Sequence, residues 1–253
     1  GELARVKAVY VTTYFDNPSS ITLSAERRPQ IVELAKRWSK HHHLFVLEDA
    51  AYRELRYEGE DYPSLRAFDP EGDTVVVTQT FSKSYSPGVR VGWGILPTGL
   101  VAPVLDQKGN IDFGSPNFSQ HLMHTVLDRG LYEPHVQKLR SAYRVKMDAM
   151  LTAADRYLSQ LPGVNWLRPT GGLYVWLELP DHVDAGIQSP LFQRAKELGV
   201  LYVPGEYCYP SEGEGVRRNR IRLSFGVQTP AGIDEGMRLL GVAIEELIGC
   251  KQA

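Results

Sequence analysis

One short stretch of the chain, TFSKSYSPGVR, combines an amine, a guanidinium and several hydroxyl groups. Thr80 and Ser82 offer hydroxyls and Arg90 offers a forked cation, which together form a donor set suited to a phosphate. Lys83 follows a β-branched run, and an amine at the end of a buried strand can form a Schiff base with a carbonyl compound. Taken alone, Lys83 could be a solvated surface residue and Ser82 could cap a turn. The combination favours an anion site with a reactive amine beside it.

Three further polar residues stand where two other apolar runs end. Asp49, in LEDAAY, is costly to bury unless it meets a cation; it could cap a helix or pair with a protonated pyridine nitrogen. Tyr52, three residues on, would share a side of a helical turn with Asp49 and could hydrogen-bond a ring hydroxyl, although core packing explains it equally well. Asn17, in DNPSS, is a good turn residue whose amide could donate to the same ring oxygen.

An arginine pair alternates with apolar residues in RIRLSF. The period of two in a strand requires Arg220 and Arg222 to face the same way. Arg222 could be a plain surface residue or a bidentate clamp for a substrate carboxylate.

The elements that must position these residues are strands alternating with helical or long connections. Apolar runs at residues 6–13, 44–52 and 73–83 predict strands, and a helix between the first two has Ser24 as a plausible N-cap and Pro29 in its first turn. Such continuous apolar runs indicate a mostly parallel sheet flanked by helices. Ligands bind at the carboxyl ends of parallel strands, so this arrangement predicts that Asn17, Asp49 and Lys83 lie in one place.

The pattern changes after residue 97. Residues 117–130 and 133–161 read as amphipathic helices, and short strands and helices alternate from residue 163 onward. We therefore expect an α/β chain with a large domain over residues 1–142 and a smaller α+β domain over residues 143–253.

Composition narrows the functional classes. A net charge of −2 with both signs interspersed favours a small-molecule partner and argues against nucleic acid or an anionic membrane. Cys208 and Cys250 have no metal-ligand spacing, which predicts free thiols, a reducing cytoplasm and no zinc site. The run His41–His43 is more typical of a basic helix C-terminus than of a metal site. No run of eighteen apolar residues and no signal peptide are evident.

The ordered motifs DNPSS, EDAAY, TFSKSYSPGVRVGW, PTGGLYVWLELP and RIRLSF resemble those of the class I/II aminotransferases of pyridoxal-phosphate fold type I, particularly the branch with 2-aminoadipate and kynurenine aminotransferases. The similarity runs through nearly the whole chain. It implies that Lys83 is the Schiff-base lysine and proton-transfer base and that Asp49 is the pyridinium partner. By the same resemblance, Asn17 and Tyr52 contact the ring oxygen, Arg222 holds the substrate α-carboxylate, and the phosphate is held by Thr80, Ser82 and Arg90.

The resemblance also implies an amino acid and a 2-oxo acid as substrates and a homodimer as the assembly. Two departures qualify it: the usual asparagine-proline-threonine-glycine motif is Asn17-Pro18-Ser19-Ser20 here, and the family extends upstream of residue 6. We therefore expect the C-terminal portion of an aminotransferase, with an incomplete parallel sheet and little or no activity in isolation. Two alternatives remain open: a lyase of the same fold, and a pyridoxal-phosphate-binding effector domain of a transcription regulator.

Overall fold

The computed structural model of the 253-residue chain describes residues 5–210, 212 and 215–249. These residues form two compact units, one drawn from the ranges 1–16 and 21–140 and the other from the ranges 17–20 and 141–253. The division falls inside one long helix, α5 (Tyr132–Tyr157). That the chain consists of two domains divided at residue 142 stays a prediction.

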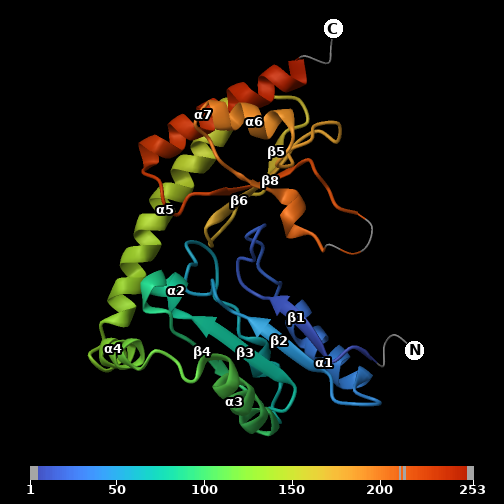
Figure 1. Cartoon of the computed structure of the whole chain (residues 1–253), viewed down its shortest axis with the longest axis vertical. Helices are drawn as coiled ribbons and strands as arrows, with labels where there is room; N and C mark the ends of the chain where they lie inside the picture. The colour runs from blue at the N-terminus through green and yellow to red at the C-terminus, as the bar shows by residue number, and fades with distance from the viewer. Residues whose placement is uncertain (1–4, 211, 213–214, 250–253) are drawn as a thin grey trace. The chain divides into compact units, whose positions relative to one another are not determined.

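A four-stranded sheet forms the centre of the first unit (Figure 1). Its strands, in spatial order, are β1 (Ala8–Thr12), β2 (Phe45–Asp49), β3 (Val75–Thr80) and β4 (Gly92–Ile95). The first three strands run parallel and β4 runs antiparallel to β3, so the predicted mostly parallel sheet is confirmed. The register pairs Thr12 with Asp49 and Asp49 with Thr78, which brings the carboxyl ends of the three parallel strands to the same edge.

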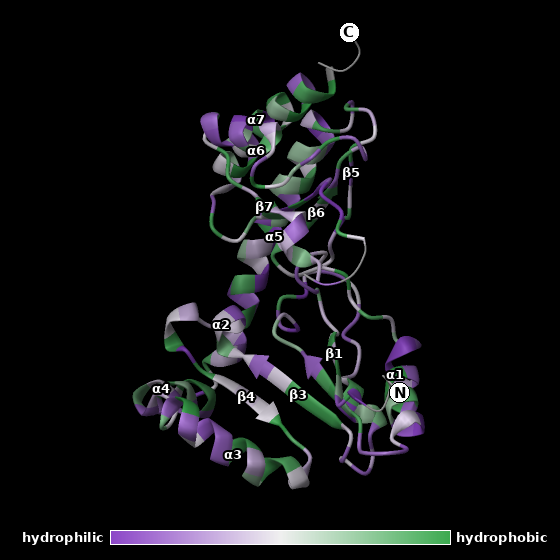
Figure 2. Cartoon of the chain, turned by 45° about the vertical axis from the view of Figure 1, so that its right-hand side comes forward, coloured by the Kyte–Doolittle hydropathy of each residue, from purple (hydrophilic) through white to green (hydrophobic). Residues whose placement is uncertain are grey.

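The polarity of β3 changes along its length. Figure 2 shows β3 hydrophobic in its first part and polar toward its carboxyl end. Val75 and Val77 are buried, whereas Gln79 and Thr80 are partly exposed. The buried half anchors the strand and the polar half carries the residues that precede Lys83.

Helix α1 (Arg27–Trp38) follows the loop after β1. The expectation that Ser24 caps this helix is wrong, because the N-cap is Glu26, whose side chain makes no capping hydrogen bond. Pro29 lies in the first turn, as predicted. The helix buries Val32 and Ala35 but leaves Trp38 51% exposed.

The remaining elements of the first unit lie after β2 and around β3 and β4. They are the 3₁₀ helices η2 (Leu65–Phe68) and η3 (Pro87–Val89) and the helices α2 (Phe81–Ser84), α3 (Thr98–Asp112) and α4 (Asn117–Asp128). Helices α4 and α5 match the predicted amphipathic segments. Helix α3 escaped sequence reasoning because it contains Gly99, Pro103 and Gly109, all unfavourable inside helices.

The second unit is built on an antiparallel sheet with strand order β5-β6-β8-β7. The strands are β5 (Asn165–Trp166), β6 (Tyr174–Glu178), β7 (Val203–Pro204) and β8 (Arg220–Ser224), and the other elements are α6 (Pro190–Glu197), η4 (Gly205–Cys208) and α7 (Pro230–Gly249). Leu177, Ile221 and Phe225 of the sheet region and Leu240 and Ile244 of α7 are at most 1% exposed and form part of the core. This is the expected smaller α+β arrangement.

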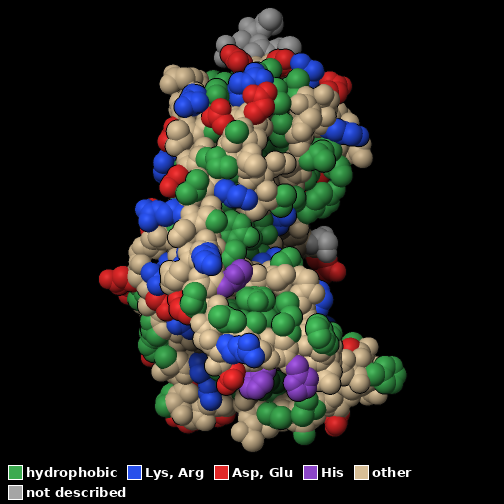
Figure 3. Space-filling view, turned by 90° about the vertical axis from the view of Figure 1, so that its left-hand side faces the viewer, with side chains coloured by type: hydrophobic (Ala, Val, Ile, Leu, Met, Phe, Trp, Pro, Cys, Tyr) green, Lys and Arg blue, Asp and Glu red, His purple; other side chains and the backbone are tan. Residues whose placement is uncertain are grey.

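The surface carries charges of both signs. Lys/Arg and Asp/Glu side chains are interspersed among hydrophobic ones on the face drawn in Figure 3. Across the described ranges, no helix combines the length and apolarity needed to cross a bilayer. The same residues contain no cluster of His, Cys, Asp and Glu arranged to hold a metal ion. His42 and His43 lie beyond the end of α1 and contact the main-chain oxygens of Val6 and Asp73.

Candidate active site

Asp49 is the last residue of β2, at the carboxyl edge of the parallel strands. Its Oδ1 accepts a hydrogen bond of 2.9 Å from the main-chain N–H of Ala51, and its Oδ2 accepts one from the hydroxyl of Tyr10. A turn follows Asp49, not a helix, so the helix N-cap interpretation is wrong. The carboxylate is half-buried and is held by one donor on each oxygen.

Lys83 lies in α2, the single helical turn that directly follows β3. Its Nζ is 5.7 Å from the ring centroid of Tyr52, within range of a cation–π contact. Tyr52 is 7% exposed and lies in the turn after β2. The Lys83 side chain is half-buried, and among the residues described by the structure its amine has no hydrogen-bond acceptor and no salt-bridge partner. Such an amine is available for chemistry.

Thr80, Ser82 and Arg90 lie together around α2 and η3. The Thr80 hydroxyl caps α2 by accepting from the main-chain N–H of Ser82 at 3.0 Å, so Thr80 is the capping residue of this turn. Arg90 donates from Nη1 to the Ser82 hydroxyl at 3.3 Å and to the Pro87 carbonyl at 3.1 Å.

The backbone of Arg90 adds a second observation. Its φ is 54°, in the left-handed region that arginine seldom adopts, and its side chain is exposed. A strained backbone at an exposed arginine next to two hydroxyls is consistent with a site built to meet an anion.

Asn17 and Arg222 belong to the second unit, in which they contact each other. Arg222 donates from Nη1 to Asn17 Oδ1 at 2.6 Å, and its guanidinium carbon lies 4.5 Å from the ring centroid of Tyr174. Arg222 Nε is buried and has no partner in the described part of the chain. An unsatisfied buried guanidinium nitrogen is unusual, and a carboxylate would satisfy it.

Arg220, two residues before Arg222, already has a charged partner. Arg220 is 6% exposed and pairs with Glu178 Oε1 at 2.6 Å. Because Tyr174 and Glu178 lie four residues apart on β6, Arg220 and Arg222 project from the same face of the sheet, as their spacing predicts. In the described part of the chain, Arg220 Nη1 has the Glu178 carboxylate as its ion-pair partner, whereas Arg222 Nε has no acidic partner.

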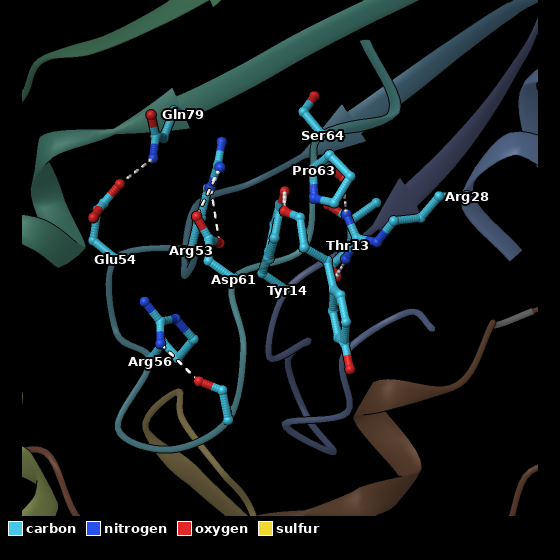
Figure 4. Close-up of polar contacts among 12 residues, drawn as sticks. Thr13, Tyr14, Arg28, Arg53, Glu54, Arg56, Asp61, Pro63, Ser64 and Gln79 are labelled. Carbon is cyan, nitrogen blue, oxygen red and sulfur yellow. Dashed lines mark hydrogen bonds and ion pairs between the residues drawn. The ribbon is translucent and has the colours of Figure 1, made fainter. Parts of the chain in front are cut away.

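Two fully buried charged side chains near the site were missed by sequence reasoning. Arg28, 0% exposed, donates to the carbonyls of Thr13 (2.8 Å), Leu23 (3.2 and 3.1 Å) and Pro63 (2.8 Å). Its guanidinium stacks on Tyr14 with 4.5 Å between guanidinium carbon and ring centroid, and Figure 4 shows Arg28 beside Thr13, Tyr14 and Pro63. Thr13 and Leu23 flank the segment that contains Asn17, so Arg28 ties together the two ends of that segment.

Glu48 is the second such residue, also 0% exposed. It accepts from the Thr13 hydroxyl at 2.8 Å, from the Leu65 N–H at 3.2 and 3.1 Å, and from the Ser64 hydroxyl. A signal existed for both residues. Arg28 precedes buried Val32 by one helical turn, and Glu48 follows buried Val46 by the two-residue period of a strand.

Comparison with known proteins identifies a protein family that this chain matches. A family model described as "Aminotransferase class I and II" matches residues 3–240. The chain is 33% identical to aromatic-amino-acid aminotransferase 1 of Thermococcus litoralis, covering 96% of this chain and 55% of the relative. It is also 33% identical to the 2-aminoadipate transaminase of Thermus thermophilus, covering 96% of this chain and 59% of the relative.

A solved structure supports the same conclusion about the fold. The multiple substrate aminotransferase of Thermococcus profundus superposes with a TM-score of 0.87 at 34% identity, over 97% of this chain and 58% of that one. The expected fold class is therefore confirmed. The chain spans between half and three-fifths of the length of the relatives that it matches.

Proposed function

Because the chain belongs to the class I and II aminotransferase family, we propose that it is the site-bearing part of a pyridoxal-phosphate-dependent enzyme that transfers an amino group from an amino acid to a 2-oxo acid. The observation that carries this proposal is the amine of Lys83, which is half-buried at the carboxyl edge of the parallel strands and has no acceptor among the described residues. Two further groups that amino-group transfer needs lie in the same unit: Tyr52, whose ring faces the amine of Lys83, and Asp49, the last residue of β2.

The residues present fit pyridoxal phosphate by the chemistry of their donors and acceptors. Thr80, Ser82 and Arg90 would hold the phosphate, because two hydroxyls and a guanidinium already lie together there. Asp49 would hold the proton of the pyridine nitrogen. The ring hydroxyl would be held by Tyr52 and Asn17.

When bound, pyridoxal phosphate supplies an electron sink that stabilises negative charge at the substrate Cα. Lys83 removes and returns the proton at that carbon, since its amine is not committed to an ion pair. Asp49 keeps the ring nitrogen protonated through a carboxylate that two protein donors hold in place. Arg222 binds the α-carboxylate of the amino acid and of the 2-oxo acid, and its unpartnered Nε supports a forked contact.

The substrate side chain is a separate question. The relatives are named for aromatic amino acids and for 2-aminoadipate, so we propose that this chain serves an aromatic or a dicarboxylic amino acid. Steady-state rates with matched aromatic and dicarboxylic amino acids, each with the same 2-oxo acid, would separate the two classes.

We propose that the assembly is a homodimer and that the protein resides in the cytoplasm. Exposed apolar side chains on and beside α3 and α4 support self-association, since Ile111 is 82%, Phe113 95% and Phe118 81% exposed. The cytoplasmic location rests on the free thiol of Cys208. Cys250 lies outside the described residues.

Borohydride reduction with pyridoxal phosphate tests the cofactor site directly. We expect reduction to link the cofactor covalently to Lys83, as read by a peptide map, and to leave Lys83→Ala unlabelled. Lys40→Ala is the matched control, because Lys40 is an exposed lysine of the same unit and its loss should change nothing. A label on any other lysine would contradict the assignment.

Absorbance spectra of half-reactions test the reaction type. Conversion of the bound cofactor to its amine form by an amino acid alone supports amino-group transfer. Release of ammonia with a 2-oxo acid from a single amino acid would indicate a lyase, and binding without either change would indicate an effector domain.

A further inference from the structure

Tyr10 lies on β1, two residues before Thr12, which the sheet register pairs with Asp49. Side chains two residues apart on a strand share a face of the sheet, so Tyr10, Thr12 and Asp49 project from the same face. Tyr10 therefore stands diagonally across from Asp49, a distance that a long aromatic side chain can span. Its hydroxyl donates a hydrogen bond to Asp49 Oδ2.

This contact completes a two-point hold on the Asp49 carboxylate. Oδ1 accepts from the Ala51 N–H at 2.9 Å and Oδ2 accepts from Tyr10, so the carboxylate cannot rotate without losing a partner. A carboxylate offers about four lone-pair positions, which leaves room for a further donor. The two hydrogen bonds thus orient the Asp49 carboxylate and leave it able to accept another.

The phenol is suited to act as the donor. Partial burial raises the pKa of Tyr10 above its usual value of 10.0, and the hydrogen bond to Asp49 raises that pKa further, although the Thr12 hydroxyl opposes the shift. Tyr10 consequently keeps its proton at neutral pH.

We propose that Tyr10 is a positioning residue that orients Asp49 toward the protonated nitrogen of a pyridine ring. The inference rests on the proposed role of Asp49 as the partner of that nitrogen. Since Tyr10 acts through Asp49, its removal weakens binding only of rings that carry the nitrogen.

The contact is tested first without any cofactor, by titrating Tyr10 in the 253-residue chain with isotope-labelled tyrosine and nuclear magnetic resonance. The Tyr10→Phe variant assigns the signal. In Asp49→Asn the pKa of Tyr10 should fall, because the negative charge that favours the protonated phenol is gone. Asp61→Asn, which removes a carboxylate paired with Arg53, is the matched control and should leave the titration of Tyr10 in place. An unchanged Tyr10 titration in Asp49→Asn overturns the proposal.

The positioning role is tested by affinity for pyridoxal phosphate and for its deaza analogue, in which a carbon replaces the ring nitrogen. Tyr10→Phe should weaken binding of pyridoxal phosphate by about 2- to 10-fold, the equivalent of one net hydrogen bond of about 0.5–1.5 kcal/mol. It should leave binding of the deaza analogue unchanged. Tyr207→Phe, at a tyrosine 60% exposed compared with 61% for Tyr10, is the matched control and should change neither affinity.

The Asp49→Asn variant separates two kinds of failure. If Asp49→Asn abolishes the preference for pyridoxal phosphate and Tyr10→Phe does not reduce it, only the role of Tyr10 is refuted. If Asp49→Asn keeps the preference, the proposed function of Asp49 is refuted as well. A chain that binds neither compound refutes the cofactor site and this inference together.

Discussion

Replacing the buried Arg28 by methionine should destabilise the first unit strongly. The guanidinium of Arg28 is 0% exposed and satisfies three main-chain carbonyls, those of Thr13, Leu23 and Pro63. Methionine fills much of the volume but offers no donor, so all three oxygens lose their charged partner, and the Thr13 oxygen loses it in a buried place. It also removes the cation from the face of Tyr14.

The magnitude follows from these contacts. A hydrogen bond to a charged group contributes about 1.5–3 kcal/mol, and the four bonds that Arg28 makes to these three carbonyls share one group and are not additive. Removing the charge also relieves the cost of desolvating it, which offsets part of the loss. We therefore expect the free energy of unfolding to fall by about 3–5 kcal/mol, a large fraction of the about 5–15 kcal/mol typical of a domain.

Urea denaturation followed by circular dichroism measures this change as a lower midpoint at an unchanged slope. Arg27→Met is the matched control, because Arg27 is exposed on the preceding residue of the same helix and its loss should cost less than about 0.5 kcal/mol. If the two variants lose the same stability, the hydrogen bonds of Arg28 do not stabilise the fold. The proposed role of Arg28 in holding Thr13 and Leu23 together is then refuted.

Three other predictions concern catalysis, acid stability and association. In an active holoenzyme that contains these residues, Lys83→Ala should abolish transamination, Asp49→Ala should remove most of it, and Arg222→Ala should chiefly raise KM, all measured by steady-state kinetics. An Asp49→Ala variant as active as the parent would show that the ring nitrogen needs no acid here. Asp69→Asn should reduce the difference between the free energies of unfolding at about pH 7 and about pH 3, each measured by urea denaturation. Burial raises the pKa of Asp69, but the N–H groups of Val75 and Thr74 and the Lys36 ammonium outweigh burial and hold it below its usual value. The carboxylate therefore stabilises the fold above about pH 4 and loses that effect as the pH falls through its folded-state pKa. If Asp69→Asn lost as much stability between about pH 7 and about pH 3 as the parent chain, this would be contradicted. In sedimentation the 253-residue chain should self-associate, because β1 forms one edge of its sheet and Val9 (38%) and Tyr10 (61%) on it are exposed; a monomer at all concentrations would contradict this.

The strands that carry the candidate site, and the long helices α4 and α5, follow from local sequence patterns. Apolar residues that either alternate with polar ones or form continuous runs predict β1, β2, β3 and β8. The positions of Asp49 and Lys83 at strand ends follow from those runs. These features are local, because a strand or helix is specified by residues that are neighbours along the chain. Local cues also mislead in two places: the sequence predicts Ser24 as the cap of α1, where Glu26 stands at the N-cap, and the glycines and proline of α3 conceal a helix that tertiary packing tolerates.

Contacts between side chains that are far apart in the sequence depend on the tertiary structure. The contacts of Tyr10 with Asp49 and of Asn17 with Arg222 join residues 39 and 205 positions apart, and no periodicity encodes such pairs. The spacing of Arg28 from Val32 and of Glu48 from Val46 was the one local signal of their burial, and it did not reveal their partners, because distant parts of the chain supply them. Strand order and register bring those parts together, since the fold sets which carbonyl, hydroxyl or carboxylate faces each charge.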